Sequence, residues 1–421
     1  MSDFFNAYSR QDWEDLALET LSEKSIESLN EIADDGIEIK AIYSSEDQKL
    51  TNPAGIPGAT PFIRGNKTSG HENGTWDIRA LIDDSTPELA NKAALNELLN
   101  GSTSLFIDPE KIGVESVNDL DKTLEDVFLN MTSIWFKPAL KGTEVAKWMI
   151  ELWDQRDIAS SDRYGGLGID PIGVNVRKGL QSDNPQKFSD LPDVIDRTGF
   201  SKAINIDSSF YPDLGGSTSA ELAYSLAVAL HYLRELEKTE IEIETIIENM
   251  YFTYSSNSDQ FMTIAKFRAA RRLWTQITKE CGATSENQKQ TQHAVASSNA
   301  MDKKDPWFNS FKATVAAFSA GIGGAEAITV IPFSLSDEIS GGESERRMAR
   351  NTQLLLAEES HIGRVIDPAG GSWFVEQLTE HLAQKSWETF QKIESSGGIV
   401  EVLNSEKKIQ DFLKIRGSSN E

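Results

Sequence analysis

Three aspartates in this sequence could bind a divalent cation. Asp83, Asp108 and Asp207 each end a short β-rich segment, and carboxylates at strand ends can hold a metal ion. Each could instead cap the following helix or order its loop. The second interpretation is favoured, because the three segments are not consecutive and no lysine or histidine accompanies the acids as a base.

Other groups that could do chemistry are few. Gly215 and Gly216 precede a capped helix, whose free N–H groups could bind a phosphate, but they lack the full spacing of a nucleotide-binding loop. His293 falls near the start of a predicted strand, where a structural role is favoured. The same holds for Cys281, which has no base nearby. The other histidines are His71, His231, His361 and His381.

Eight short β-rich runs, each separated from the next by a helical pattern, must position these residues. They cover residues 76–83, 104–108, 133–138, 172–177, 203–207, 250–254, 293–298 and 327–333. Eight strand–helix units in series predict an α/β fold, a (β/α)8 TIM barrel, whose chemistry lies at the C-terminal ends of the strands.

Three segments follow from composition along the chain. Residues 1–50 are expected to form an N-terminal helical and extended arm. Residues 51–365 are expected to form the barrel, and residues 366–421 a C-terminal helical segment. The arm would lie outside the barrel. Its apolar residues, notably Trp13 and Leu16, belong to a segment too short to have its own core.

Charge and cysteine content narrow the class of protein. The 66 acidic and 41 basic residues give a formal charge of −25, which disfavours binding to nucleic acid or to an anionic membrane. The single cysteine excludes an internal disulfide and suits a reducing compartment. No apolar run is long enough to span a membrane, so a cytoplasmic location is expected.

Several motifs together resemble the acyl-CoA-binding barrel of the methylmalonyl-CoA mutase family. They lie at residues 57–65 (PGATPFIRG), 75–79 (TWDIR), 266–274 (KFRAARRLW), 349–353 (ARNTQ) and 366–372 (IDPAGGS). The resemblance implies a (β/α)8 barrel and a link to adenosylcobalamin-dependent interconversion of methylmalonyl-CoA and succinyl-CoA, a step of propionate metabolism. The short N-terminal segment is similar to that of the small, or beta, subunits of the family.

Departures from the catalytic pattern of the family affect its substrate site. Leu81 stands where catalytic members have a tyrosine, and Tyr211 where they have a histidine. Met250 and Phe252 stand for an arginine and a serine that hold the acyl-CoA. Together with Arg79, which matches the family, they would form a degenerate pocket. The resemblance therefore implies no catalytic residue, and no cofactor or metal ligand, in this chain.

The cobalamin-binding motif D-x-H-x-x-G of the family is absent from the sequence, and no cobalamin-binding domain is expected. Two hypotheses remain open. The first is a non-catalytic small subunit that scaffolds a large subunit carrying adenosylcobalamin, in a heterodimeric isomerase (an intramolecular mutase). The second is an acyl-CoA-binding barrel enzyme that works with a separate cobalamin-binding chain.

Overall fold

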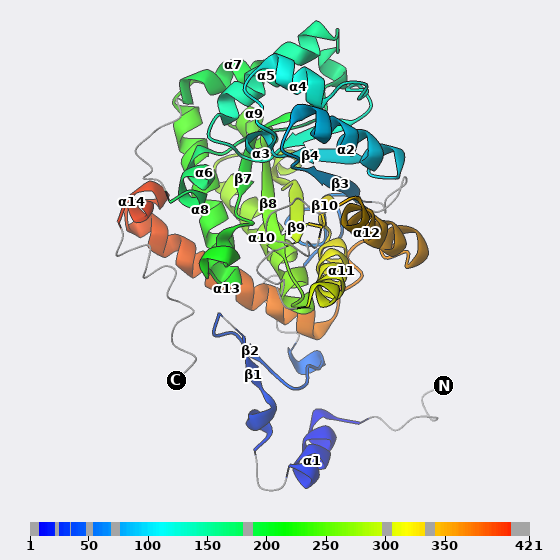
Figure 1. Ribbon diagram of the computed structural model, residues 1–421. Coiled ribbons are helices and arrows are strands. Elements are labelled where there is room, and N and C mark those ends of the chain that lie inside the picture. Colours follow the sequence, from blue (N-terminus) through cyan, green and yellow to red (C-terminus); the bar gives the residue numbers. More distant parts are fainter. Residues whose placement is uncertain are drawn as a thin grey trace.

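The computed structural model describes residues 8–21, 25–33, 35–47, 54–68, 76–179, 188–296, 305–332 and 342–405 (Figure 1). These residues form a closed barrel of parallel strands in the order β10-β3-β4-β5-β6-β7-β8-β9. The strands are β3 (Asp77–Ile82), β4 (Ser104–Ile107), β5 (Ser133–Phe136), β6 (Gly165–Ile169), β7 (Lys202–Asp207), β8 (Met250–Ser256), β9 (Gln292–Ala296) and β10 (Ala327–Thr329). The predicted (β/α)8 TIM barrel is confirmed.

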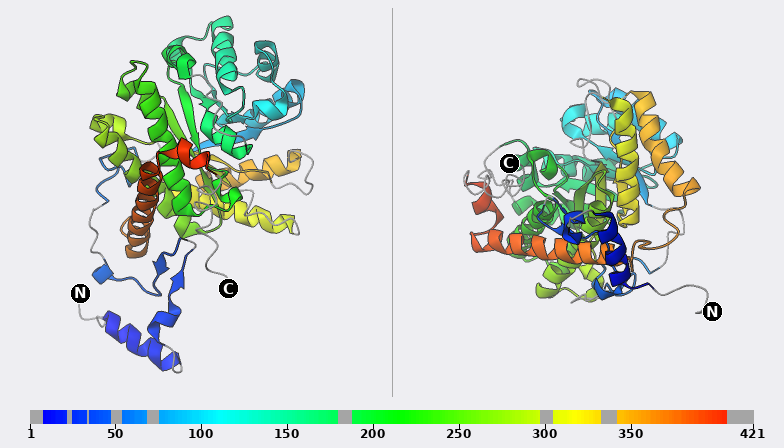
Figure 2. Two further views of the ribbon diagram at one scale, coloured as in Figure 1. Left: turned by 90° about the vertical axis from the view of Figure 1, so that its left-hand side faces the viewer. Right: turned by 90° about the horizontal axis from the view of Figure 1, so that it is seen from below.

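Helices follow every barrel strand and cover its outside (Figures 1 and 2). In chain order they are α2 (Pro87–Leu99), α3 (Pro109–Ile112), α4 (Val117–Thr123), α5 (Gly142–Gln155), α6 (Pro171–Arg177), α7 (Leu191–Arg197), α8 (Thr218–Glu237), α9 (Ile243–Glu248), α10 (Gln260–Glu280), α11 (Pro306–Ile322) and α12 (Glu343–Leu354), which continues as a π-helical turn, η8 (Leu355–Glu359). Their buried faces and the outer faces of the strands form one apolar core.

Helix starts explain how the chain turns back after each strand. Asp108, at the end of β4, accepts a hydrogen bond from Lys111 N at 3.1 Å and caps α3. Asp170 caps α6 in the same way through Gly173 N at 2.9 Å. A proline follows each of these aspartates in the first turn of the helix, where its missing N–H costs nothing.

The prediction of the fourth strand is wrong. Residues 172–177 lie in helix α6, and the fourth barrel strand is β6, Gly165–Ile169. The β-branched alternation after Pro171 is typical of a strand, but Asp170 and Pro171 start a helix there. The strand itself has little side-chain pattern, because Gly166 lies against Trp135: a Cβ on Gly166 would lie 2.3 Å from that indole ring.

The first part of the N-terminal arm, with α1, stands away from the barrel in Figures 1 and 2, whereas Asp35 later in the arm contacts α8. The arm contains α1 (Arg10–Thr20), a 3-10 turn η1 (Ile26–Leu29), the antiparallel strands β1 (Glu31–Ile32) and β2 (Glu38–Ile39), and a 3-10 turn η2 (Ser45–Asp47). Helix α1 buries none of its residues. The arm was expected to be helical and extended, and of its residues 37–43 only Glu38 and Ile39 pair as a strand.

Helix α13 (Trp373–Ser395) lies across α8 and α10, and α14 (Ile399–Leu403) follows it. The buried face of α13 includes Leu378, Leu382 and Phe390, which join the core. The expected C-terminal helical segment contains both helices. Within the described ranges, no helix has the length and apolar character needed to cross a membrane.

Candidate functional site

A cavity of about 170 Å³ opens at the C-terminal end of the barrel strands, and we call it the mouth pocket. Its walls come from the ends of β3, β4, β7, β9 and β10 and from the loops that follow the strands. The lining residues are Leu81, Phe106, Lys137, Arg177, Asp207, Ser209, Phe210, Asp213, Val295, Ala296, Thr329 and Ile331. This is the position at which (β/α)8 barrels carry their chemistry.

Two cations face the mouth pocket, and each has a carboxylate partner. The Lys137 Nζ lies 2.9 Å from Asp108 Oδ2, and the Arg177 guanidinium lies 3.5 Å from Asp207 Oδ2. Burial works to raise the pKa of Asp108, but the charge and hydrogen bond of Lys137 outweigh it and hold that pKa below its ordinary value. The rim of the pocket is therefore polar, and each of its two positive charges is balanced by a carboxylate.

The three strand-end aspartates do not meet as a metal site. Asp83 pairs with Lys111 at 2.8 Å, whereas Asp108 caps α3 and pairs with Lys137. Asp207 accepts hydrogen bonds from the backbone N–H and hydroxyl of Ser209 at 3.1 and 2.6 Å. Within the part of the chain that the structure describes, no cluster of three or more His, Cys, Asp or Glu side chains suits a metal ion.

Below the mouth pocket, the axis of the barrel is filled by Arg79, Trp135 and Tyr251. The Arg79 guanidinium carbon lies 3.8 Å from the centre of the Trp135 ring. The Arg79 Nη2 also forms an ion pair with Asp77 Oδ2 at 2.8 Å. Trp135 meets Tyr251 edge-on at 4.8 Å, and the Tyr251 hydroxyl donates to the Phe136 carbonyl at 3.3 Å. Burial lowers the pKa of Arg79, although Asp77 opposes this effect.

A second layer of side chains joins the axis to β9 and β10. The His293 ring meets Phe106 edge-on at 4.9 Å, and its Nε2 lies 2.8 Å from the Thr329 hydroxyl. That hydroxyl also lies 3.0 Å from the Arg79 carbonyl, to which it can donate. Burial, with the nearby charge of Arg79, holds the pKa of His293 well below its ordinary value. His293 is therefore a neutral core residue, in line with its predicted structural role.

Met250 and Phe252 do not line the mouth pocket, and this corrects the predicted degenerate pocket. Phe252 packs against Trp274 of α10, with ring centres 4.8 Å apart. Met250 shares its face of β8, because side chains alternate along a strand, and it belongs to the same buried layer. Tyr251 faces the axis instead. The bulk that fills the barrel therefore comes from Tyr251, Trp135 and Arg79.

Leu81 and Tyr211 occupy different environments. Leu81 lines the mouth pocket. Tyr211 does not line the pocket but is buried in the 3-10 turn η5 (Tyr211–Leu214), where its ring packs on Gly216 and lies 5.0 Å from Tyr224. Burial raises the pKa of Tyr211 well above its ordinary value, so the phenol stays protonated.

The N-terminus of α8, considered above as a phosphate site, is already occupied by side chains of this chain. Ser217 caps the helix by accepting from Ala220 N at 3.3 Å. The carboxylate of Asp35, from the arm, accepts from Ser219 N at 3.2 Å and from the Ser219 hydroxyl at 2.5 Å. Asp35 carries no motif in the sequence, and its position is known only from the fold.

Comparison with known proteins places the barrel in a family. The family model described as methylmalonyl-CoA mutase matches residues 32–112 and 110–412. The chain belongs to this family. It is 37% identical over 384 residues to the methylmalonyl-CoA mutase small subunit of Streptomyces virginiae, covering 90% of this chain and 61% of that protein. The predicted resemblance to a small subunit is therefore confirmed.

Two further relatives have similar coverage. The methylmalonyl-CoA mutase small subunit of Propionibacterium freudenreichii subsp. shermanii is 34% identical over 88% of this chain and 58% of its own length. A methylmalonyl-CoA mutase of Rhizobium meliloti is 25% identical over 94% of this chain and 59% of its own length. The chain thus spans about three fifths of the length of these relatives.

Residues that carry the resemblance to the methylmalonyl-CoA mutase family pack together outside the axis. Arg268 of α10 pairs with Asp367 and, at 2.7 Å, with Glu376, and Arg64 pairs with Asp367 at 2.8 Å. Arg271 donates to carbonyl oxygens of Phe62 and Ile63 at 3.0 and 2.9 Å, and of Gly323 at 2.7 Å. Three of the five motifs therefore hold the 54–68 loop and the start of α13 on α10.

The mouth pocket can be checked for a side chain that would ligate the cobalt of a cobalamin. None of its described lining residues is a histidine or a cysteine, and His293 is buried in the core. Asn351, which matches the family, is exposed on α12. The described residues therefore offer the mouth pocket no axial ligand for a cobalt ion.

Proposed function

We propose that this chain is a non-catalytic small subunit that scaffolds an adenosylcobalamin-dependent methylmalonyl-CoA mutase large subunit in a heterodimer. The observation that carries the proposal is the set of side chains at the mouth pocket. Leu81 lines it where catalytic members have a tyrosine, and Tyr211 is packed under Gly216 rather than presented to the pocket. A radical mutase needs a hydrogen-bonding group at the thioester carbonyl, and leucine supplies none.

The filled axis supports the same proposal. Arg79, Trp135 and Tyr251 pack against one another inside the barrel, and Arg79 and Tyr251 are almost fully buried, so a ligand could reach below the mouth pocket only by displacing them. Arg79 is held by Asp77, Ser104 and the indole ring through its Nε and Nη2 and its ring contact, whereas its Nη1 has no hydrogen-bond partner among the described residues. Removing these contacts to admit a ligand would leave buried polar groups without partners.

The arm supports a role in association. Helix α1 buries no residue, and Leu16 and Leu18 are 65% and 47% exposed. A helix of this length is marginal in isolation, so a partner surface would stabilise it. We place the complex in the cytoplasm and in propionate metabolism, with adenosylcobalamin on the large subunit.

A competing function is an acyl-CoA-binding barrel enzyme that works with a separate cobalamin-binding chain. Lys137 and Arg177 favour it, because cations at a pocket rim suit a carboxylate. Their existing pairing with Asp108 and Asp207 weakens that argument.

Co-expression with the large subunit of the same organism tests the two functions. The proposal predicts one chain of each kind in the purified complex, methylmalonyl-CoA turnover by the complex, and none by this chain alone. Turnover by this chain with a cobalamin-binding chain, in the absence of the large subunit, would establish the competing function.

A further inference from the structure

The N-terminal arm is attached to the barrel at few points. Of the arm residues that the structure describes, only Asp35 and Ile37 are buried, with 3% and 7% of their surface exposed. Both lie in the turn between β1 and β2, and in Figure 1 these two strands stand between α1 and the barrel. We call this turn the hairpin tip (residues 33 and 35–37). The attachment of the arm depends mainly on it.

Asp35 joins the hairpin tip to the start of α8. Its carboxylate accepts from the Ser219 backbone N–H at 3.2 Å and from the Ser219 hydroxyl at 2.5 Å. The acceptor is charged, and it lies at the positive end of a 20-residue helix, so both hydrogen bonds are strengthened. Ser219 is itself fully buried. Withdrawal of Asp35 would leave these buried donors without their acceptor, which favours the attached state.

The local structure of the hairpin tip brings Asp35 to α8. Gly36 donates its N–H to the Ala33 carbonyl at 2.8 Å, and Ala33 donates its N–H to the Ile37 carbonyl at 2.9 Å. Gly36 has a φ of +71°, which a residue without a Cβ adopts without strain. Ile37 then packs into the apolar core of the barrel. The tip therefore carries a charged anchor and an apolar anchor two residues apart.

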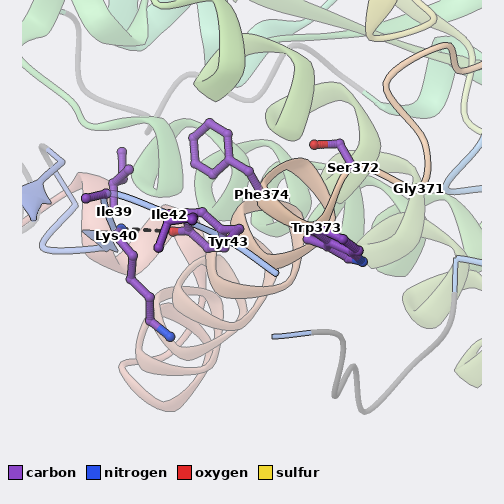
Figure 3. A pocket seen from close by; sticks show the side chains of 9 residues that line it. Ile39, Lys40, Ile42, Tyr43, Gly371, Ser372, Trp373 and Phe374 are labelled. Carbon is purple, nitrogen blue, oxygen red and sulfur yellow. Dashed lines mark hydrogen bonds between the residues drawn. The ribbon is translucent and has the colours of Figure 1, made fainter. Parts of the chain in front are cut away.

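A second attachment holds the end of the arm on α13. Tyr43 packs on Phe374, with ring centres 5.0 Å apart, and Figure 3 shows both side chains. Gln377 of α13 donates its side-chain amide to the Asp47 carbonyl. The Asp47 carboxylate pairs with Arg10 of α1 at 3.5 Å. An arm attached at this point alone could turn about it, whereas a second attachment at the hairpin tip fixes its direction.

We propose that Asp35 is a latch, which fixes the hairpin tip on α8 and so sets the direction in which α1 projects from the barrel. Helix α1 buries none of its residues, so its own packing does not set that direction. A partner that binds α1 meets an arm that is already oriented, and less ordering is needed on binding. The inference rests on the proposed small-subunit function and adds the residue that positions the arm.

The latch affects affinity through the fraction of molecules in which it is closed. If the large subunit binds only the oriented arm, the apparent dissociation constant is the intrinsic constant divided by that fraction. A variant in which about one tenth of the arms are oriented therefore binds about tenfold more weakly. In this account Asp35 is a positioning residue, because it acts through α1 and does not itself contact the partner.

The test compares variants of the full-length chain. Asp35→Ala removes the latch from the arm, and Ser219→Ala removes its hydroxyl donor from the barrel. Asp119→Ala is the matched control, because Asp119 also accepts from a serine hydroxyl at a helix start, that of Ser116 at 2.8 Å. It lies on α4, at the opposite end of the molecule from the arm in Figure 1. Thermal unfolding checks that each variant keeps the folded barrel.

The first measurement is hydrogen exchange at the hairpin tip, followed by NMR. The amides of Ala33 and Gly36 should exchange at least about tenfold faster in Asp35→Ala than in the wild type, while amides of the barrel strands keep their rates. Ser219→Ala should change the tip in the same direction, and Asp119→Ala should leave it unchanged. Wild-type exchange at the tip in both latch variants would overturn the inference without involving the partner.

The second measurement is affinity for the large subunit of the same organism. Asp35→Ala should weaken binding about tenfold in the otherwise wild-type chain. It should change affinity less than about twofold when Ala17→Pro has already broken α1, because the latch acts through that helix.

Two results would overturn the positioning role and leave the small-subunit function standing. One is unchanged affinity of Asp35→Ala, and the other is an equal loss with α1 intact and with α1 broken. Absence of any complex with the wild-type chain would overturn the proposed function and with it the positioning role.

Discussion

The guanidinium of Arg79 lies 3.8 Å from the centre of the Trp135 ring, inside the barrel. Gly166, on the neighbouring strand β6, leaves room for this stack, because any side chain there would overlap the indole ring and the edge of Tyr251. The pair therefore fills the interior of the barrel below the mouth pocket, as side chains do in (β/α)8 barrels generally. A cation over an indole ring, paired also with Asp77, belongs to the packed core.

Gly166→Ala should destabilise the barrel by about 1–3 kcal/mol, because the new methyl group overpacks the Arg79–Trp135 stack. Urea unfolding measures the change. Gly142→Ala is the control, since its Cβ would meet no atom closer than 3.6 Å, and its stability should stay within about 0.5 kcal/mol of the wild type. Equal stability of the two variants would mean that the space around Arg79 and Trp135 can accommodate a further methyl group.

Lys266→Met should destabilise the protein by about 3–5 kcal/mol, because it leaves a buried carboxylate without its cation. The Lys266 Nζ lies 2.7 Å from Glu221 and 2.6 Å from the Ser255 hydroxyl, and all three residues are almost fully buried. The double variant Lys266→Met/Glu221→Leu should recover much of the loss. Additive losses in a double-mutant cycle would exclude the predicted coupling.

Asp170 should make stability fall as pH rises. Burial, reinforced by the charge of Asp207, raises its pKa to about 7, although Tyr232 and Gly173 N donate to it. The folded state therefore holds a proton that the unfolded state has lost between about pH 4 and 7. The stabilising contribution of Asp170 is largest below about pH 4 and declines up to about pH 7.

The measurement for Asp170 compares the wild type with Asp170→Asn, which does not titrate. The difference in free energy of unfolding, wild type minus variant, should fall by at most about 1.4 kcal/mol per pH unit across that window. A difference that rises with pH would show that the carboxylate is ionised in the folded state throughout.

Deleting residues 1–25 should leave the barrel folded and weaken its association with the large subunit at least tenfold. Helix α1 buries no residue, and it meets the end of the arm through the pair of Arg10 with Asp47 at 3.5 Å. Thermal unfolding of the truncated chain gives the control, and quantitative binding to the large subunit gives the result. A complex of unchanged affinity would assign the arm to its own barrel alone.

The sequence predicts the barrel well where strands carry side-chain patterns. Seven of the eight predicted runs overlap barrel strands, because β-branched residues recur between helices with clear caps. The exception, β6, is glycine-rich because Trp135 and Tyr251 take the space of its side chains, and no local pattern signals that exchange.

The candidate site was less predictable. Leu81 could be placed at the mouth of the barrel from its position late in β3. The side chain of Tyr251 faces the inside of the barrel, whereas those of Met250 and Phe252 face outward. This depends on the register of β8, because a shift of one residue would exchange the inward and outward side chains. The contacts of Asp35 with Ser219 and of Tyr43 with Phe374 join segments far apart in the chain, so only the fold reveals them.

The most direct test of the central claim is the number of acyl-CoA sites per complex. Calorimetric titration of the purified heterodimer with succinyl-CoA should give one site for each pair of chains, all of it on the large subunit. The isolated chain should show no saturable binding below about millimolar concentration, or roughly −4 kcal/mol. Two equivalent sites per heterodimer, or a micromolar isotherm for this chain alone, would contradict the claim that it has no substrate site.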